Sequence, residues 1–136
     1  MSIENVERID GVAQYDLIVI GSGSGNTLIG PEWDDKKVAL IDGGIFGGTC
    51  LNVGCIPTKM YVYPATIAQK TREVKHLGVD AHVDAVHWAQ IRDRIFASRI
   101  DQIVEGGREW RAGLPNVDFY DQYARFVGSP TVELTD

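Results

Sequence analysis

The stretch that decides the fold is residues 15–26, YDLIVIGSGSGN. Its first half, residues 15–20, is a nearly continuous apolar run, which is typical of a strand buried on both faces of a parallel sheet. The run leads directly into a glycine-rich turn, residues 21–26. A strand, a glycine-rich turn and then a helix start form the arrangement in which backbone N–H groups bind a pyrophosphate. We therefore predict an α/β, Rossmann-like fold with a dinucleotide site at this turn.

An acidic residue supports this interpretation. A second predicted strand, residues 37–41, ends at Asp42, which lies 21 residues after Gly21. An acid at about this spacing accepts the ribose hydroxyls of an adenine dinucleotide. Asn26 stands in place of the third glycine of the G-x-G-x-x-G pattern, and we expect this departure to affect packing rather than phosphate binding. A glycine turn without a ligand is the competing interpretation, and the strands and the spaced acid favour the dinucleotide.

Both cysteines of the chain lie in residues 47–60, GGTCLNVGCIPTKM. Residues five apart on an uninterrupted α-helix have Cα atoms roughly 8.7 Å apart, which exceeds the limit of about 7 Å for a disulfide. If Cys50 and Cys55 are bridged, the backbone between them must be distorted, and Gly54 can adopt unusual dihedral angles. Pro57 suits the first turn of the helix that follows. We expect such a bridge to be strained and easily reduced, as a redox pair requires.

Other interpretations of the two cysteines remain open. A zinc site would need further ligands, but the chain has no third cysteine and its histidines lie far away in the sequence, so we predict no metal site. A pair of unrelated buried thiols is the second alternative. The nucleotide-binding pattern upstream favours a redox pair, as does the rarity of structural disulfides in a reducing compartment.

The composition indicates one globular unit. With 136 residues, 44% of them hydrophobic, the chain can bury a single core. The net charge of -6 and the pI near 5.0 argue against a nucleic-acid partner. No apolar run approaches the roughly 20 residues that span a bilayer, and residues 1–14 lack an apolar signal-peptide core. We therefore expect a cytoplasmic protein without a nucleic-acid or membrane partner, in which a loose polar arm, residues 1–14, precedes the domain, residues 15–136.

The remaining pattern predicts two helices and three short strands. The first helix should run from Pro57 to about His76, with Gly78 at its end and a kink at Pro64. A second, long helix should begin after Asp84 as N-cap. Its predicted apolar face consists of Trp88, Ile91, Ile95, Ile100, Ile103 and Val104. Residues 117–120, 123–127 and 131–134 are predicted strands, the last two joined by a turn at residues 128–130.

Residues 47–59 resemble the redox-active segment of the flavin disulfide reductases, the class I pyridine nucleotide-disulfide oxidoreductases. The segment is long and specific. Within this family, residues 21–26, 46–63 and 78–84 are most similar to the branch that reduces mycothione, which shares Asn26. The resemblance covers nearly the whole chain but only about the first third of the family's enzyme.

The resemblance implies FAD as the cofactor and assigns a role to each motif. The isoalloxazine would lie beside Cys55, whose thiolate faces the flavin, while Cys50 exchanges with the substrate disulfide. Lys59 would pair with the flavin's central ring, where a cation stabilises the reduced anion. Phe126 matches the aromatic residue near the adenine. The implied FAD-binding residues are Gly21, Gly23, Ser24, Gly25, Asp42, Gly43, Gly48, Thr49, Cys50, Lys59 and Ala124.

The function implied by the resemblance is an NADPH-dependent disulfide reductase. Electrons would pass from NADPH through FAD to Cys50 and Cys55, and then to a small-molecule disulfide, for which mycothiol disulfide is the first expectation. The NADPH site, the second half of the FAD domain, the homodimer-forming domain and a histidine-glutamate pair would lie beyond residue 136, so we expect this chain alone to be inactive. The alternatives are a glutathione-reductase-like or lipoamide-dehydrogenase-like member, or a non-catalytic flavin-binding or thiol redox module.

Overall fold

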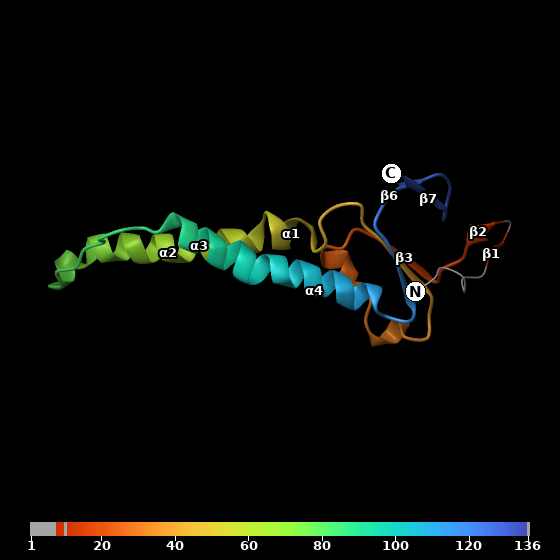
Figure 1. The fold of residues 1–136 in the computed structure, drawn as a ribbon, viewed down its shortest axis with the longest axis horizontal. Coiled ribbons are helices and arrows are strands. Elements are labelled where there is room, and N and C mark those ends of the chain that lie inside the picture. The colour runs from red at the N-terminus through yellow and green to blue at the C-terminus, as the bar shows by residue number, and fades with distance from the viewer. Residues whose placement is uncertain (1–7, 10, 136) are drawn as a thin grey trace. The chain divides into compact units, whose positions relative to one another are not determined.

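The structure, a computed structural model, describes residues 8, 9 and 11–135 (Figure 1). The chain divides into two compact units. Of the described residues, those up to Gly48 and those from Val104 onward form the first, here called the sheet unit, and residues Thr49–Ile103 form the second, the helical unit. No helix of the described part is long and apolar enough to cross a membrane.

A three-stranded parallel sheet is the framework of the sheet unit. Its strands are β3 (Leu17–Ile20), β4 (Val38–Ile41) and β5 (Val117–Tyr120), in the order β3-β4-β5. The strands start level with one another, because their first residues are paired side by side. All four residues of β4 are buried, as expected for a central strand with both faces covered. The predicted α/β, Rossmann-like fold is confirmed at this sheet.

One face of the sheet carries the core of this unit. Side chains alternate between the two faces of a strand, and the residues at the odd positions of β3 and β5 and the even positions of β4 lie on the same face. The buried core cluster consists of Val19, Ile29, Val38, Leu40, Phe46 and Val117. Val104 of helix α4 (Asp101–Ala112) packs against it. Burial of each large apolar side chain stabilises the fold by about 1.5–3 kcal/mol.

Two antiparallel hairpins complete the sheet unit. β6 (Tyr123–Phe126) pairs with β7 (Val132–Thr135), which confirms two of the predicted strands, whereas the third, residues 117–120, belongs to the parallel sheet as β5. Strands β1 (Arg8–Ile9) and β2 (Val12–Ala13) form a hairpin within the predicted arm, which the sequence analysis did not foresee. Residues 1–7 and 10 of that arm lie outside the described residues.

The segment after the glycine turn forms short 3₁₀ turns instead of a long helix. The first is η2 (Ser24–Leu28) and the second is η3 (Pro31–Trp33). Pro31, which follows Gly30, has no N–H with which to extend the first turn. Residues 21–37, which connect β3 to β4, therefore contain 3₁₀ turns in place of the usual crossover helix.

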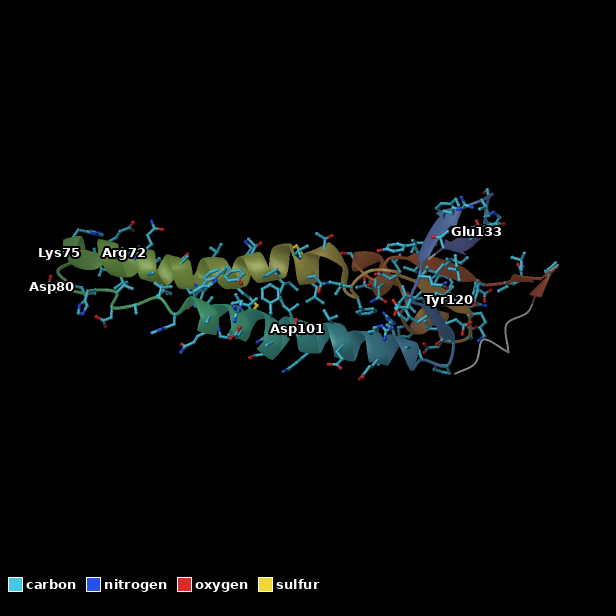
Figure 2. All side chains as sticks on the ribbon, turned by 45° about the horizontal axis from the view of Figure 1, so that its top comes forward. Arg72, Lys75, Asp80, Asp101, Tyr120 and Glu133 are labelled. Carbon is cyan, nitrogen blue, oxygen red and sulfur yellow. A yellow bond between two sulfur atoms is a disulfide. The ribbon has the colours of Figure 1, made fainter. Side chains whose placement is uncertain are left out.

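The helical unit contains a long helix and a shorter helix beside it (Figure 1). α1 (Gly48–Asn52) leads into α2 (Cys55–Glu73), and the 3₁₀ turn η4 (Val74–Leu77) ends at Gly78 with a φ of 78°. The first predicted helix is therefore confirmed, with its start two residues earlier than predicted. Figure 2 labels Arg72, Lys75 and Asp80 at the end where the chain turns back.

The return helix begins later than predicted. α3 (Trp88–Ile95) starts after His87, and the predicted N-cap, Asp84, lies in an irregular segment and pairs with His82 at 3.0 Å. The prediction of Asp84 as N-cap is therefore wrong, because the helix begins four residues later and His87 occupies the N-cap position.

The apolar face of the return helix is only partly buried. Ile95 and Ile100 are buried, whereas Trp88 and Ile103 are exposed. The π-helical turn η5 (Phe96–Ile100) separates α3 from α4, and its five-residue hydrogen bonding places residues five apart one above the other. Ile95 and Ile100 therefore face the same side, which the regular helical period of the prediction does not give.

Candidate functional site

The glycine turn presents bare backbone at the end of β3. Gly21 has a φ of 93°, in the left-handed region that favours glycine, and its N–H donates to the Ile41 carbonyl at 2.7 Å. A Cβ at Gly21 would meet no atom within 4 Å, so this side of the turn is open. Gly23 precedes η2, while Ser24 and Gly25 lie exposed in its first turn. Open backbone at the start of a helical turn is what an approaching phosphate requires.

Asp42 closes the turn through Ser22. The Ser22 N–H donates to Asp42 Oδ2 at 2.7 Å, and the Ser22 hydroxyl donates to the same oxygen. Asp42 Oδ1 accepts the N–H of Gly44 at 2.8 Å, and the Ser22 Oγ accepts the N–H of Gly47 at 2.8 Å. The carboxylate predicted to bind a ribose is thus itself held in place. Oδ1, with one bond from Gly44, has a further lone pair with which to accept a hydroxyl.

The electrostatics of Asp42 favour its charged form. Burial by itself would raise the pKa of this carboxyl, but the hydrogen bonds from the Ser22 side chain, the Ser22 N–H and the Gly44 N–H lower it below its ordinary value. Asp42 is therefore a carboxylate at neutral pH, and it is an acceptor only.

Two predicted glycines, Gly48 and Gly43, allow backbone segments to approach closely. A Cβ on Gly48, whose φ is 67°, would lie 2.7 Å from the Cα of Gly23. At Gly43 a Cβ would lie 2.8 Å from the backbone N of Tyr123. Ala124, on β6, follows Tyr123 directly and is half-buried. The structure therefore brings Gly23 to Gly48, and Gly43 to the strand of Ala124.

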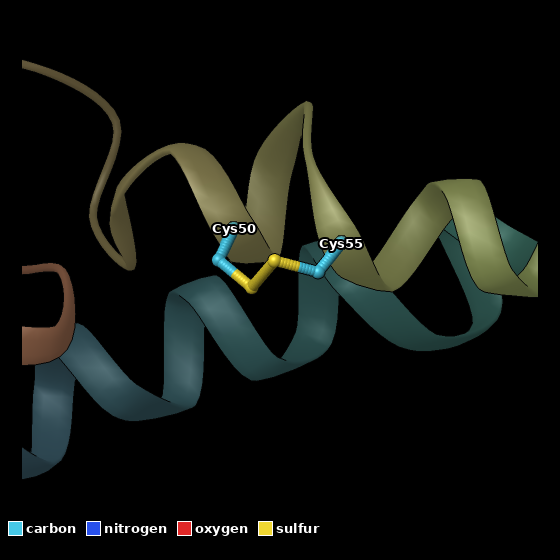
Figure 3. Close-up of a disulfide and its surroundings, with 2 residues drawn as sticks. All are labelled: Cys50 and Cys55. Carbon is cyan, nitrogen blue, oxygen red and sulfur yellow. A yellow bond between two sulfur atoms is a disulfide. The ribbon is translucent and has the colours of Figure 1, made fainter.

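The two cysteines form a disulfide at the break between α1 and α2 (Figure 3). Their Cα atoms are 4.8 Å apart, far closer than an uninterrupted helix allows. Gly54 lies at the break with φ -122° and ψ -120°, and a Cβ there would lie 2.8 Å from the Thr49 carbonyl oxygen. A glycine is therefore required for the chain to fold back far enough to bring the sulfurs together.

The disulfide segment exposes its reactive groups. Cys50, Cys55 and Thr49 are exposed, as is Lys59 on α2. Lys59 follows Cys55 by four residues, so both side chains lie on the same face of the helix. A thiolate at Cys55, the first residue of α2, would be stabilised by the positive end of the helix dipole. The segment offers an accessible disulfide next to a cation.

The described residues form cavities away from the glycine turn and contain no candidate metal site. A cavity of 690 Å³ in the helical unit is lined by side chains from Tyr63 to Arg94. Another, of 840 Å³ in the sheet unit, includes Ile18, Ala39 and Tyr120. Phe126, which matches the aromatic residue near the adenine, lines the second cavity, whereas no residue of the glycine turn lines either cavity. The described residues hold no cluster of three or more His, Cys, Asp or Glu that could bind a metal ion.

Two site residues escaped the sequence analysis. Ser22 is 2% exposed and connects the turn to Asp42, but a serine between glycines carries no signal of its own in a single sequence. Arg111 of α4 is 5% exposed and donates to the carbonyls of Asn26 and Ile29, more than 80 residues away in the chain. Its position becomes visible only when α4 is packed against the turn.

The comparisons with known proteins agree with the residues above. The chain is 46% identical over 112 residues to a mycothione reductase of Mycobacterium tuberculosis, a match that covers 82% of this chain and 24% of that protein. Over its matched length, the chain is similar to the flavin disulfide reductases. It spans about a quarter of the length of the curated relatives it matches. No family model matches it.

Other flavin disulfide reductases match the same chain less closely. A glutathione reductase of Debaryomyces hansenii is 30% identical over 128 residues, covering 89% of this chain and 26% of that protein. Among solved structures, the HOCl-induced flavoprotein disulfide reductase RclA of Escherichia coli, in its Cu(II) complex, matches with a TM-score of 0.65 and 26% identity, over 88% of this chain and 24% of that one. The incomplete Rossmann-like domain and the family resemblance predicted from the sequence are therefore confirmed.

Proposed function

We propose that this chain is the part of an NADPH-dependent disulfide reductase that binds FAD and carries the redox-active disulfide. The observation that supports it most is the exposed Cys50–Cys55 disulfide. Cys50 follows Gly48 by two residues, and Gly48 is in turn fitted against Gly23 of the glycine turn. Two residues of chain span at most about 7 Å, so connectivity alone keeps Cys50 near the turn.

The residues present fit the adenine-nucleotide end of FAD. The open side of Gly21 and the N–H groups at the start of η2 provide a surface for a pyrophosphate. Asp42 is charged and keeps an acceptor position on Oδ1 for a ribose hydroxyl. Ala124 and its strand lie beside Gly43, which follows Asp42 directly. We propose Gly21, Gly23, Ser24, Gly25, Asp42, Gly43 and Ala124 as the residues for this end of the cofactor.

The cysteines carry out the exchange reaction. FAD, when bound, supplies the two electrons that reduce the Cys50–Cys55 disulfide to two thiols, with uptake of two protons. The Cys50 thiolate then attacks the substrate disulfide, forms a mixed disulfide and releases the first substrate thiol. Cys55 attacks the Cys50 sulfur, which releases the second thiol and restores the original disulfide.

Thr49 and Lys59 complete the proposed redox end of the site. Lys59 is exposed and lies one helical turn after Cys55, so its cation favours the Cys55 thiolate. The same cation would stabilise negative charge that develops on the cofactor. Gly48 and Thr49 provide backbone between the glycine turn and Cys50.

The substrate proposed for the whole enzyme is mycothiol disulfide. The support is the 46% identity to a mycothione reductase, compared with 30% to a glutathione reductase. We further propose that residues 15–136 are the N-terminal part of the FAD-binding domain, behind an arm of residues 1–14. The NADPH site, central domain and homodimer interface would then be contributed by residues outside this chain.

A flavin spectrum of the 136-residue chain tests the proposal. We expect the purified chain to bind FAD, and dithionite reduction to produce a long-wavelength absorbance band that depends on a thiolate next to the flavin. The band should disappear in Cys55→Ser and persist in Cys50→Ser. A chain that folds but binds no FAD would contradict the proposal, and a band lost only in Cys50→Ser would reverse the two cysteine roles.

Substrate choice needs the product of the complete reading frame. NADPH oxidation with mycothiol disulfide, glutathione disulfide and lipoamide as alternatives should be fastest with the first. A preference for glutathione disulfide or lipoamide would retain the family mechanism and reject the substrate. FAD binding without turnover of any disulfide would indicate a non-catalytic redox module instead.

A further inference from the structure

Arg111 is a buried cation attached to the glycine turn. It lies near the end of α4 and is 5% exposed. One terminal nitrogen, Nη1, donates to the Ile29 carbonyl at 2.9 Å, and the other, Nη2, donates to the Asn26 carbonyl at 2.8 Å. Both carbonyls belong to the end of η2, the turn whose beginning is proposed to bind the pyrophosphate. The guanidinium thus binds the rear of the phosphate-binding turn.

The two carbonyls need this donor because the helix stops. In a continuing α-helix the Asn26 carbonyl would accept the N–H of residue 30, and the Ile29 carbonyl that of residue 33. Here the Gly30 N–H donates to Leu28 and the Trp33 N–H donates to Gly30. The Asn26 carbonyl keeps a single backbone bond, from Ile29, at 3.2 Å. Arg111 therefore supplies the donors that the interrupted helix lacks.

The Arg111 guanidinium is buried, which by itself is unfavourable for a charged group. Burial lowers the pKa of Arg111, which means that the surroundings disfavour its charge. The described residues form no salt bridge with Arg111, and its guanidinium lies over the Trp110 ring, 4.3 Å from the centroid. A buried charge without a carboxylate partner is costly. Its partners are carbonyl dipoles at the C-terminal end of a helical turn, where a cation is favoured.

Two further buried atoms occur in the same pair of residues. Arg111 Nε and Asn26 Oδ1 have no hydrogen-bond partner among the described residues. The backbone carbonyl of Asn26 is bound, while its side-chain oxygen is not. The bond that holds the turn is therefore made to the backbone at Asn26 and does not depend on the asparagine side chain. A substitution of Asn26 therefore removes the side-chain oxygen and leaves the carbonyl that Arg111 binds.

We propose that Arg111 is a positioning residue for FAD: it replaces the missing helix and fixes η2 so that the N–H groups at its start stay aligned on the pyrophosphate. The proposal rests on the proposed FAD site at the glycine turn. It assigns to a residue in the second half of the chain an indirect role in cofactor affinity. Arg111 acts through η2 and does not itself touch the cofactor.

Substitutions at Arg111 and at a matched arginine test the proposal. Arg111→Gln removes the charge and the forked donor, and we expect the dissociation constant for FAD to rise by about tenfold, as expected for loss of charge-assisted hydrogen bonds. Arg111→Lys keeps the charge but not the fork and should recover only part of the affinity. Arg108→Gln, on the same helix but exposed, should change FAD affinity less than about twofold. Asn26→Ala keeps the bound carbonyl and should bind FAD like the parent chain.

Hydrogen exchange of the apo chain distinguishes positioning from general destabilisation. In Arg111→Gln, and in Arg111→Lys should the first variant not fold, the hydrogen-bonded amides of Asn26 and Ile29 should exchange faster while those of β4 remain protected. Unchanged exchange at Asn26 and Ile29 in a folded variant would overturn the proposal, as would equal losses of protection in β4. Loss of FAD affinity in Asn26→Ala equal to that in Arg111→Gln would also overturn it. If the parent chain binds no FAD, the proposed function fails, whereas the apo exchange pattern still reports whether Arg111 holds the turn.

Discussion

The glycine turn and the disulfide segment are close in sequence but are built in opposite ways. At the turn, Ser22 is 2% exposed and donates both its N–H and its hydroxyl hydrogen to Asp42. In the disulfide segment, both cysteines and Lys59 are exposed. The turn is therefore arranged by its own hydrogen bonds, while the disulfide segment keeps accessible side chains for exchange. A substitution in one segment should leave the property of the other intact.

The largest expected effect is a loss of thiol-disulfide exchange without a loss of FAD binding. Cys50→Ser removes the proposed attacking sulfur and should abolish thiol-disulfide exchange, because the remaining thiol cannot reform the bridge. FAD affinity should stay within about threefold, because the glycine turn is unchanged. Exchange is measured with an aromatic disulfide, and affinity by flavin fluorescence.

Alkylation of the reduced chain tests the same assignment. Iodoacetamide should label Cys50 before Cys55 when the peptides are identified by mass spectrometry. Preferential labelling of Cys55 would assign the attacking role to that sulfur. Residual exchange in Cys50→Ser at the parent rate would remove the redox role from this pair.

Much of the difference between the glycine turn and the disulfide segment can be predicted from local sequence patterns, whereas contacts between distant residues cannot. The apolar runs at β3 and β4, the glycine turn and Gly78 after the first helix are read from neighbouring residues, and all are present in the structure. The prediction of Asp84 as N-cap failed because residues 84–87 stay irregular and the helix begins only at Trp88. Arg111 acquires its role from contacts distant in sequence, which one sequence does not reveal.

Ser22→Ala should weaken the turn without affecting the cysteines. The substitution removes the hydroxyl that donates to Asp42 and accepts the Gly47 N–H, and each such partly buried hydrogen bond contributes about 0.5–1.5 kcal/mol of unfolding free energy. Urea denaturation of the apo chain measures this loss. Ser24→Ala, at an exposed position, should change stability by less than about 0.5 kcal/mol. Equal stability of both variants would mean that the hydroxyl network does not hold the turn.

Adjacent glycines on α4 offer a matched pair for the sheet unit. A Cβ on Gly107 would lie 2.9 Å from the buried Phe46 ring, whereas one on Gly106 would meet nothing within 4 Å. Gly106→Ala should stabilise the helix by up to about 1 kcal/mol. Gly107→Ala gains the same helix propensity but must displace Phe46, so we expect a net loss of about 1–2 kcal/mol. Thermal unfolding of the two variants should shift in opposite directions, and a common shift would show that α4 approaches Phe46 less closely than the structure indicates.

The smallest effect concerns the pH dependence of the turn. The pKa of Asp42 is lowered in the folded chain, because hydrogen bonds from Ser22 and Gly44 outweigh the effect of burial. A lowered folded pKa gives stability that is present above the unfolded value of about 3.9 and is lost as the pH falls through the folded pKa. Asp42→Asn should therefore flatten the fall in unfolding free energy below about pH 4. The disulfide has no group that titrates near pH 4, so Cys50→Ser should keep the parent chain's fall in unfolding free energy with decreasing pH. If Asp42→Asn shows the same fall as the parent chain, the Asp42 carboxylate is not held as described.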